Sequence, residues 1–402
     1  MKTRIVNIEN TAAARKFIAQ TGADPYSVGL MAPKAVFRTV LVENADNRAA
    51  NLLKQDMLSL GGEAAVSEKV SRFEKRSSKL LLMGTLRQFG LLAQKLSGQP
   101  FGLKAIAEEL KLVLGNYERK DHVLKAGKFR LELGDEVCVM GILNVTPDSF
   151  SDGGSYTDPA MALARALEMQ EEGAGIIDVG GESSRPGAKP LSVKEEIKRV
   201  VPVIRAAVKK LKVPVSIDTY KPEVARVAIE EGARVINDIT ALGSAGGRKM
   251  AMLAAASGLP LILMHMRGTP RTMQKKPVYA DVISEISVFF EARAAFACRY
   301  GVKRGQLILD PGIGFGKTCE HNTEILKRLG EFKSLGLPIA VGVSRKSFIG
   351  TLLGGAPAGE RLFGSVSAGL MAALNGASIL RVHDVRQTKE ALRVMRGITR
   401  GI

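Results

Sequence analysis

The stretch of sequence that decides the fold is residues 140–154, MGILNVTPDSFSDGG. It begins inside an apolar run, residues 137–145, which is typical of a buried parallel strand. The run then becomes polar at Asn144, and the loop that follows contains hydroxyls and two acids before it closes on Gly153 and Gly154. A strand that delivers such groups into a glycine-ended loop indicates a functional site, although an ordinary polar loop is the alternative for this stretch alone.

The same design recurs along the rest of the chain. A short apolar run ends in polar residues, a helical pattern follows, and glycine or proline precedes the next strand. Eight strands are predicted, at residues 138–145, 175–179, 213–217, 235–239, 260–264, 307–309, 338–343 and 379–382. Helical patterns lie between or after them, among others at residues 158–172, 193–210, 221–231, 281–300, 360–375 and 387–396. This count favours a closed (β/α)8 TIM barrel over an open doubly wound sheet, because no dinucleotide glycine fingerprint is present.

The pattern of residues 1–136 predicts a separate small α/β domain, which precedes the barrel domain, residues 137–402, in the sequence. Strand-like runs occur at residues 35–42 and 79–83, and helical periodicity occurs at residues 47–60, 85–96 and 103–114. The charged segment 119–135 is predicted to form a short hairpin or strand that leads into the barrel. No cluster of histidines, cysteines or acids stands at a useful spacing in this domain, so its role is unknown.

Composition restricts the class of protein. With 46% apolar and 24% charged residues, the 402-residue chain resembles a soluble globular protein, and no apolar run reaches the roughly 18 residues of a membrane span. We expect a cytoplasmic protein, because there is no apolar signal core and because Cys138, Cys298 and Cys319 are scattered and odd in number. The net charge of +18 is spread over both halves. It fits attraction of small anions or a merely basic surface, and no nucleic acid or membrane partner is expected.

The carboxyl ends of all strands in a parallel barrel surround one mouth, so residues distant in sequence converge there. One group of these converging residues consists of acids and amides, whose oxygens suit a heterocycle rich in N–H donors. Alternatively, Asp218 and Asp310 could cap the helices that follow them. The polar residues at the strand ends are Asn144, Asp178 with Glu182, Ser183, Ser184 and Arg185, Asp218 and Thr219, Asn237 and Asp238, His265, Asp310, Ser344 to Lys346, and Arg381 with His383 and Asp384.

A second group is cationic and suits a phosphate or diphosphate, which arginine can bind in forked geometry. It consists of Arg185, Arg345, Lys346, Arg381 and His383. A third group, Asn144 with Asp148 and Asp152, offers the oxygen ligands that Mg²⁺ takes beside a polyphosphate, although the spacing alone does not establish a metal site.

Eight motifs in this chain closely resemble the dihydropteroate synthase family. They are MGILNVTPDSFSDGG (140–154), GGESSRPGA (180–188), SIDTYKPEVA (216–225), INDITAL (236–242), LILMHMRGTP (261–270), LDPGIGFGKT (309–318), VGVSRKSFIG (341–350) and RVHDV (381–385). They cover all eight strand ends in family order, from about residue 137 to residue 398. The resemblance implies a transferase of folate biosynthesis that joins 4-aminobenzoate to 6-hydroxymethyl-7,8-dihydropterin diphosphate with Mg²⁺, and gives 7,8-dihydropteroate and diphosphate.

The resemblance also implies roles for individual residues. The catalytic residues would be Asp148, Lys346, Arg381 and His383. The pterin would be held by Asp218, Asn237, Asp310, Phe315 and Lys346, and the diphosphate by Ser184, Arg185, Arg381 and His383. The 4-aminobenzoate pocket, where sulfonamides compete, would be framed by Phe150, Pro186, Arg345 and Ser347, and Asn144 would bind Mg²⁺. Ser184 stands where the family commonly has threonine, and its hydroxyl is kept.

Two other functions remain to be distinguished. A pterin-binding methyltransferase of the corrinoid type would share the acids and amides but would have no use for the cations. A pterin-binding protein without catalysis would not need the intact loops. Synthases of this family are commonly homodimers, and the Gly/Ala-rich helix predicted at residues 365–375 could pack against a partner or against the barrel.

Overall fold

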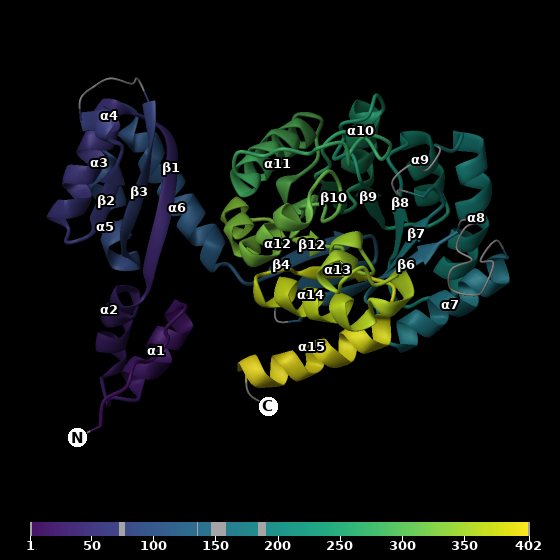
Figure 1. Ribbon diagram of the computed structural model, residues 1–402, viewed down its shortest axis with the longest axis horizontal. Helices are drawn as coiled ribbons and strands as arrows, with labels where there is room; N and C mark the ends of the chain where they lie inside the picture. The colour runs from purple at the N-terminus through teal and green to yellow at the C-terminus, as the bar shows by residue number, and fades with distance from the viewer. Residues whose placement is uncertain (1, 72–76, 135, 146–157, 184–189, 401–402) are drawn as a thin grey trace. The chain divides into compact units, whose positions relative to one another are not determined.

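The computed structural model describes residues 2–71, 77–134, 136–145, 158–183 and 190–400 (Figure 1). The chain forms two compact units, Met1–Glu118 and Arg119–Ile402, and each unit has its own sheet and its own apolar core. Within the described ranges, none of the helices combines the length and the apolar character that crossing a membrane requires.

The first unit is a three-stranded antiparallel sheet with helices packed on it. Strand β3 lies between β1 and β2. Its elements are α1 (Thr11–Ala19), α2 (Pro25–Ala35), β1 (Phe37–Asp46), α3 (Asn47–Ser59), β2 (Glu63–Val66), α4 (Glu68–Ser71), β3 (Ser77–Thr85), α5 (Leu86–Leu96) and α6 (Leu103–Glu118). Apolar residues of α3, β3, α5 and α6 form its core, among them Leu53, Leu82 and Phe89. The sequence predicted β1, β3, α3, α5 and α6, but not α1, α2, α4 or β2.

The second unit contains an eight-stranded parallel sheet, in the order β11-β10-β9-β8-β7-β6-β13-β12. Its strands are β6 (Cys138–Asn144), β7 (Ile176–Gly180), β8 (Val215–Asp218), β9 (Val235–Asp238), β10 (Leu261–Met264), β11 (Leu307–Asp310), β12 (Ala340–Val341) and β13 (Ile379–Val382). A parallel bridge between Leu309 and Ile339 joins the first and last strands of this order and closes the barrel. The predicted TIM barrel is therefore confirmed, and its strands begin and end within about two residues of the predicted positions.

Helices surround the barrel and follow its strands (Figure 1). They are α7 (Pro159–Glu171), α8 (Val193–Lys210), α9 (Pro222–Glu230), α10 (Gly247–Ser257), α11 (Val282–Arg299), α12 (Cys319–Lys327), α13 (Ser347–Leu352), α14 (Leu362–Leu374) and α15 (Val385–Arg400), with short 3₁₀ turns η2 (Arg304–Gln306), η3 (Leu329–Leu335) and η4 (Ala358–Glu360). Side chains such as Val203 and Phe290 pack between helices and strands in the larger apolar core. The helices thus bury the outer faces of the strands, while the inner faces are left to fill the barrel.

A β-hairpin, β4 (His122–Ala126) with β5 (Phe129–Leu133), closes the lower end of the barrel, which is the end where the parallel strands begin. Leu124 and Leu133 belong to one apolar cluster with the inward-facing Met140, Ile176 and Val235 at the lower end of the strands. The hairpin was predicted from the sequence, but it packs as part of the barrel. The compact barrel unit therefore begins at Arg119, earlier than the predicted start at residue 137.

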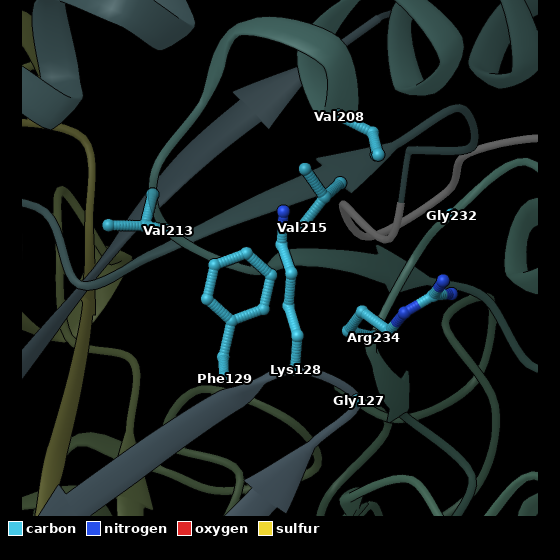
Figure 2. Close-up of a pocket in the computed structure, with 8 residues that line it drawn as sticks. All are labelled: Gly127, Lys128, Phe129, Val208, Val213, Val215, Gly232 and Arg234. Atoms are coloured by element: carbon cyan, nitrogen blue, oxygen red, sulfur yellow. The ribbon is translucent and has the colours of Figure 1, made fainter.

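A cavity of about 280 Å³ lies beside this hairpin (Figure 2). Its walls come from the hairpin, from Val208 of α8, and from Val215 and Arg234 at the amino ends of β8 and β9. Figure 2 shows the Phe129 ring between Val213 and the Lys128 side chain, with the Arg234 guanidinium directed away from them. The cavity lies at the end of the barrel opposite the predicted mouth, so it is separate from the strand-end residues of the site.

Candidate active site

Alternation along the strands places four polar residues inside the upper barrel. Side chains two residues apart on a strand point to the same face, and the residues below these four, such as Ile379 below Arg381, fill the lower barrel. The four residues are Asp178 on β7, Asp218 on β8, Asn237 on β9 and Arg381 on β13. Because β8 and β9 pair Asp218 directly with Asn237, the predicted pterin residues lie side by side.

Asp178 is the centre of a hydrogen-bond network in this region. It is fully buried, and its Oδ2 accepts hydrogen bonds from Nε of Arg381 at 2.6 Å and from Nδ2 of Asn237 at 3.0 Å. Nη2 of Arg381 also donates to Oδ2 of Asp218 at 2.8 Å. Two carboxylates therefore hold one guanidinium. The sequence placed Asp178 at a strand end but gave it no role, because a pattern indicates which face a residue occupies and not how deep it lies.

The electrostatics of Asp218 follow from this network. Burial raises the pKa of Asp218 to about 7, while Arg381 opposes the rise and the negative charge of Asp178 adds to it. The capping role considered for this residue is not the one it has. Helix α9 is preceded by Lys221, which makes no side-chain cap, and Asp218 pairs with the guanidinium instead.

Asp310, Phe315 and Lys346 also come together at the mouth, as the sequence predicted. Nζ of Lys346 donates to the backbone carbonyl of Ile313 and lies 4.7 Å from the centroid of the Phe315 ring. Burial lowers the pKa of Lys346 to about 8, with Asp310 opposing this effect and Arg381 adding to it. Burial raises the pKa of Asp310 as well, and Lys346 opposes that rise. Oδ1 of Asp310 accepts from the backbone N–H of Gly312 at 2.7 Å, so it shapes its own loop and does not cap a helix.

Lys317 holds the loop after β11 in place, and the sequence analysis gave it no role. Its Nζ donates to the carbonyl oxygens of Gly312 and Phe315, each at 3.0 Å, and lies 2.9 Å from Nδ1 of His265. Burial lowers the pKa of Lys317 well below its usual value, and burial together with the charge of Lys317 lowers the pKa of His265 to about 2. The signal in the sequence was a lysine directly after a loop with three glycines, whose backbone carbonyls need a donor when they are buried.

The predicted diphosphate side of the mouth contains His383 and Arg345. Nδ1 of His383 lies 3.0 Å from Oγ of the buried Ser344, and the backbone N–H of His383 donates to the same oxygen at 3.2 Å. Arg345 donates to both carboxylate oxygens of Asp384, from Nη2 at 2.7 Å and from Nε at 3.2 Å. Both side chains are thus oriented by neighbours from the ends of β12 and β13.

The backbone at Arg345 is in the left-handed region, with φ of 58°. Its N–H donates to Oγ of Ser365 at 2.8 Å, and its carbonyl accepts from Nη1 of Arg361 at 3.0 Å. A non-glycine residue in this conformation is uncommon and persists where neighbours fix it, which is typical of functional loops. Ser347, the first residue of α13, is exposed close by.

A second ion cluster lies beside the network, on the side of β7 and β8. Nζ of Lys221 donates to Oε2 of Glu182 and to Oε2 of Glu196, the latter at 2.5 Å. Although burial acts in the opposite sense, the hydrogen bonds to both glutamates raise the pKa of Lys221. Oε2 of Glu182 also accepts from the backbone N–H of Leu191 at 2.9 Å. This cluster ties the end of β7 to the start of α8.

The oxygen donors at the mouth are compatible with Mg²⁺. A Cβ atom placed on Gly180 would lie 3.6 Å from Oδ1 of Asn144 and 3.6 Å from Oδ2 of Asp218, so both oxygens face the space that this glycine leaves open. Mg²⁺ needs only one or two protein oxygens when phosphate oxygens and water complete its shell. Among the described residues, no three His, Cys, Asp or Glu side chains are grouped to hold a metal ion by themselves.

Five of the predicted site residues lie outside the described residues. They are Asp148, Phe150, Ser184, Arg185 and Pro186. The predictions for them therefore remain predictions. The pterin and diphosphate residues Asp218, Asn237, Asp310, Phe315, Lys346, Arg381 and His383 all lie at the mouth formed by the strand ends.

Comparisons with known proteins agree with this geometry. The family described as pterin binding enzyme matches residues 140–383, which is more than half of the chain. The dihydropteroate synthase of Escherichia coli (strain K12) is 51% identical over 257 residues, which are 64% of this chain and 90% of that protein. A solved structure of Xanthomonas albilineans dihydropteroate synthase with 4-aminobenzoic acid is 43% identical, has a TM-score of 0.65, and corresponds to 70% of this chain and 99% of that one.

The protein has a (β/α)8 barrel whose mouth contains acids, an amide and cations. This combination defines its class, the pterin-binding barrels. The chain belongs to the dihydropteroate synthase family of pterin binding enzymes. A probable bifunctional folylpolyglutamate synthase/dihydropteroate synthase of Halobacterium salinarum is 38% identical over 388 residues, which are 96% of this chain. The first unit is therefore shared with that relative, although this chain spans only 46% of its length.

Proposed function

We propose that this protein is a folate-biosynthetic transferase that condenses 6-hydroxymethyl-7,8-dihydropterin diphosphate with 4-aminobenzoate to 7,8-dihydropteroate and diphosphate. The observation that carries the proposal is the single mouth in which Asp218, Asn237 and Asp310 lie beside Lys346 and Arg381. Acceptors for a pterin and cations for a diphosphate are the two requirements of this reaction. A relative that is 51% identical over 257 residues carries the name of this activity.

The pterin would lie on the floor of the mouth. Asp218 and Asp310 supply carboxylates for ring N–H and amino donors, and Asn237 supplies an amide that can accept or donate. Phe315 offers an aromatic ring to the flat heterocycle. Nζ of Lys346, which lies 4.7 Å from the centroid of that ring, would donate to a pterin oxygen or nitrogen. The pterin would thus be held by groups from the ends of four different strands.

The diphosphate would lie at the rim, against Arg381 and His383 together with Ser184 and Arg185. The pKa of Arg381 is raised by its two carboxylate partners against the effect of burial, so this guanidinium keeps its charge throughout the working pH range. We propose that Mg²⁺ binds through the amide oxygen of Asn144 at the end of β6, because the ion needs only one or two protein oxygens when phosphate oxygens and water complete its shell. When bound, the ion would neutralise charge on the departing diphosphate.

The 4-aminobenzoate would approach from the side of Arg345. We propose that Phe150, Pro186, Arg345 and Ser347 frame its pocket, with a cation for the carboxylate. The bidentate pair with Asp384 keeps the Arg345 guanidinium oriented in advance. Ser347 is accessible at the start of α13.

The bond changes are simple once both substrates are held. The C–O bond to diphosphate breaks and its electron pair leaves with the diphosphate, which Arg381 and His383 stabilise. The dihydropterin ring delocalises the positive charge on the carbon that remains, and Asp218 and Asp310 stabilise that charge. The nitrogen of 4-aminobenzoate then forms the new C–N bond, and the proton that it loses passes to the departing diphosphate or to water. We propose that Asp148 takes part in this step from the first loop, which would also keep water away from the cation.

Diphosphate release tests the proposal. The purified protein is given the pterin diphosphate and Mg²⁺, with and without 4-aminobenzoate, and released diphosphate is measured. Release should depend on 4-aminobenzoate and should fall about 10- to 100-fold in Lys346→Ala, since a charge-assisted contact is lost. The matched control is Lys249→Ala, because the Lys249 side chain is 77% exposed on α10 and should not affect turnover.

The test also separates the alternatives. A corrinoid-type methyltransferase or a non-catalytic pterin binder would bind the pterin but release no diphosphate. The observation against the methyltransferase is the oriented cation set around Arg381, His383 and Arg345, which serves no methyl transfer. We further propose that the protein is a cytoplasmic homodimer, to be checked by sedimentation; its three cysteines are all free, which suits a reducing compartment.

A further inference from the structure

We propose that Asp178 is a positioning residue, which keeps Arg381 and Asn237 in place while Asp218 changes its partner from Arg381 to the pterin. The inference rests on the proposed function and extends it to a residue that does not touch the substrates. It follows from three features of the network: the depth of each side chain, the charges around Arg381, and the hydrogen-bonding capacity of Asn237.

The first feature is depth. The side chain of Asp178 is 0% exposed, whereas those of Asp218 and Arg381 are 14% and 22% exposed. A ligand in the mouth can therefore reach Asp218 and Arg381 but not Asp178. Asp178 is the partner that remains when a substrate enters.

The second feature is the charge balance around Arg381. In this structure its guanidinium has two carboxylate partners, Asp178 through Nε and Asp218 through Nη2. A pterin on the floor of the mouth offers N–H donors that compete for Asp218, and the diphosphate brings a new anion for the guanidinium. Arg381 thus exchanges one anion for another on its accessible side. Because Asp178 holds Nε on the other side, the guanidinium plane keeps its orientation during this exchange.

The third feature is the orientation of the Asn237 amide. A carboxylate paired with a guanidinium can only accept hydrogen bonds, so Asn237 must direct its NH₂ group toward Asp178. The amide oxygen is then directed away from Asp178, as an acceptor for an N–H donor of the ring. A neutral amide in place of Asp178 would allow the Asn237 amide to rotate by 180° and to present the wrong group.

The strand register supplies a matched control for the experiment. Ser216 on β8 is the direct Cα partner of Asp178 and is also fully buried. Its Oγ has no hydrogen-bond partner among the described residues, and neither has Oδ1 of Asp178. Ser216→Ala therefore changes a buried polar group at the same level of the barrel without touching the network.

The experiment compares Asp178→Asn and Ser216→Ala with the wild-type chain. Affinity for 6-hydroxymethylpterin without diphosphate is measured by fluorescence, and kcat/KM is measured for each substrate. We expect Asp178→Asn to lower pterin affinity and kcat/KM for the pterin diphosphate by about 10- to 100-fold, the effect of losing a hydrogen bond to a charged group. The KM for 4-aminobenzoate should change less than about threefold, and Ser216→Ala should match wild type.

Equal losses for both substrates, or unchanged pterin affinity in a folded Asp178→Asn variant, would overturn the inference. Should that variant not fold, Asp178→Asn is combined with Arg381→Gln, because removing both members of a buried ion pair is less harmful than removing one. The double variant should then bind the pterin about 10-fold more weakly than Arg381→Gln alone, through the freed Asn237 amide, and equal affinity would contradict the proposal. A wild-type chain that binds the pterin but releases no diphosphate would refute only the proposed function.

Discussion

At the scale of single residues, the buried Lys317 side chain holds the loop after β11, although the sequence predicted no role for it. Its Nζ donates to the carbonyl oxygens of Gly312 and Phe315, and the Gly312 carbonyl also accepts from the backbone N–H of Phe315 at 3.0 Å. We expect Lys317→Met to lower the free energy of unfolding by about 1 to 3 kcal/mol, because the Phe315 carbonyl loses its donor and a buried polar group left unsatisfied costs about this much. Pterin affinity should fall with it, since the same loop carries Phe315.

Denaturant unfolding and pterin titration check this expectation. Lys327→Met is the matched control, because Lys327 is exposed on α12 and a surface substitution changes stability by roughly 0.5 kcal/mol or less. Two variants of equal stability would show that Lys317 does not hold the loop.

The lowered pKa of Lys346 predicts a pH dependence. As the pH rises through about 8, the free protein loses the proton of this ammonium, so kcat/KM for the pterin diphosphate should fall on the alkaline side. The sign for stability is the opposite: burial of the charged lysine costs stability below about pH 8, and this cost is relieved as the pH approaches the ordinary value of 10.5.

The check is a profile of kcat/KM between about pH 7 and 10 for wild type and for Lys346→Arg. A guanidinium stays protonated up to about pH 12, so the alkaline fall should disappear in the variant even if its activity is lower. A fall at the same pH in both proteins would assign it to another group.

At the scale of elements, the loop between β11 and α12 depends on the absence of a side chain at Gly312. This glycine has φ of 65°, and a Cβ placed on it would lie 2.0 Å from the carbonyl oxygen of His265 at the end of β10. Gly312→Ala must therefore displace one of the two strand ends. We expect a loss of stability above about 2 kcal/mol together with a loss of pterin binding, because both strain and displacement contribute.

Gly258 provides the comparison for this prediction. It has nearly the same φ, 67°, but nothing lies within 4 Å of a Cβ placed there. Gly258→Ala should cost only about 1 kcal/mol, from the left-handed conformation alone. Similar losses in the two variants, measured by thermal unfolding, would show that close approach at Gly312 is unimportant.

Much of the site could be predicted at this scale, because each parallel strand ends at the mouth and alternate residues share a face. That rule was enough to place Asp218, Asn237, Asp310 and Arg381 together. The rule could not show that Asp178 binds Arg381 and Asn237, because the depth of a side chain inside the barrel depends on the register of three strands. Strand β2 was missed because it has only four residues, two of them alanines with little strand preference. Helix α2 contains Gly29 and Pro33, both poor helix formers that weaken the helical pattern.

At the scale of the whole molecule, the hairpin β4–β5 predicts where the chain can be divided. The first unit has a separate apolar core, so residues 119–402 should fold and turn over substrate without residues 1–118. A chain that starts at residue 137 lacks the hairpin and exposes Met140, Ile176 and Val235 at the lower end of the barrel. It should lose about 5 kcal/mol or more, since each large apolar side chain contributes about 1.5–3 kcal/mol when buried.

Thermal unfolding and diphosphate release of the two truncated chains make the comparison. Complete loss of turnover in a folded 119–402 chain would assign a catalytic role to the first unit. Equal stability of both truncated chains would show that the hairpin is dispensable.

The shared contacts of the pterin floor also bear on how inhibitor resistance can arise. Arg381 binds Asp178 and Asp218, and Asp178 binds Arg381 and Asn237, so a change at any one of these residues also alters its neighbours. A single substitution that excludes a pterin mimic would disturb the network on which the natural substrate depends. Selection should therefore find resistance changes more easily among the residues that surround the 4-aminobenzoate. Compounds that occupy the pterin floor should retain their effect for longer.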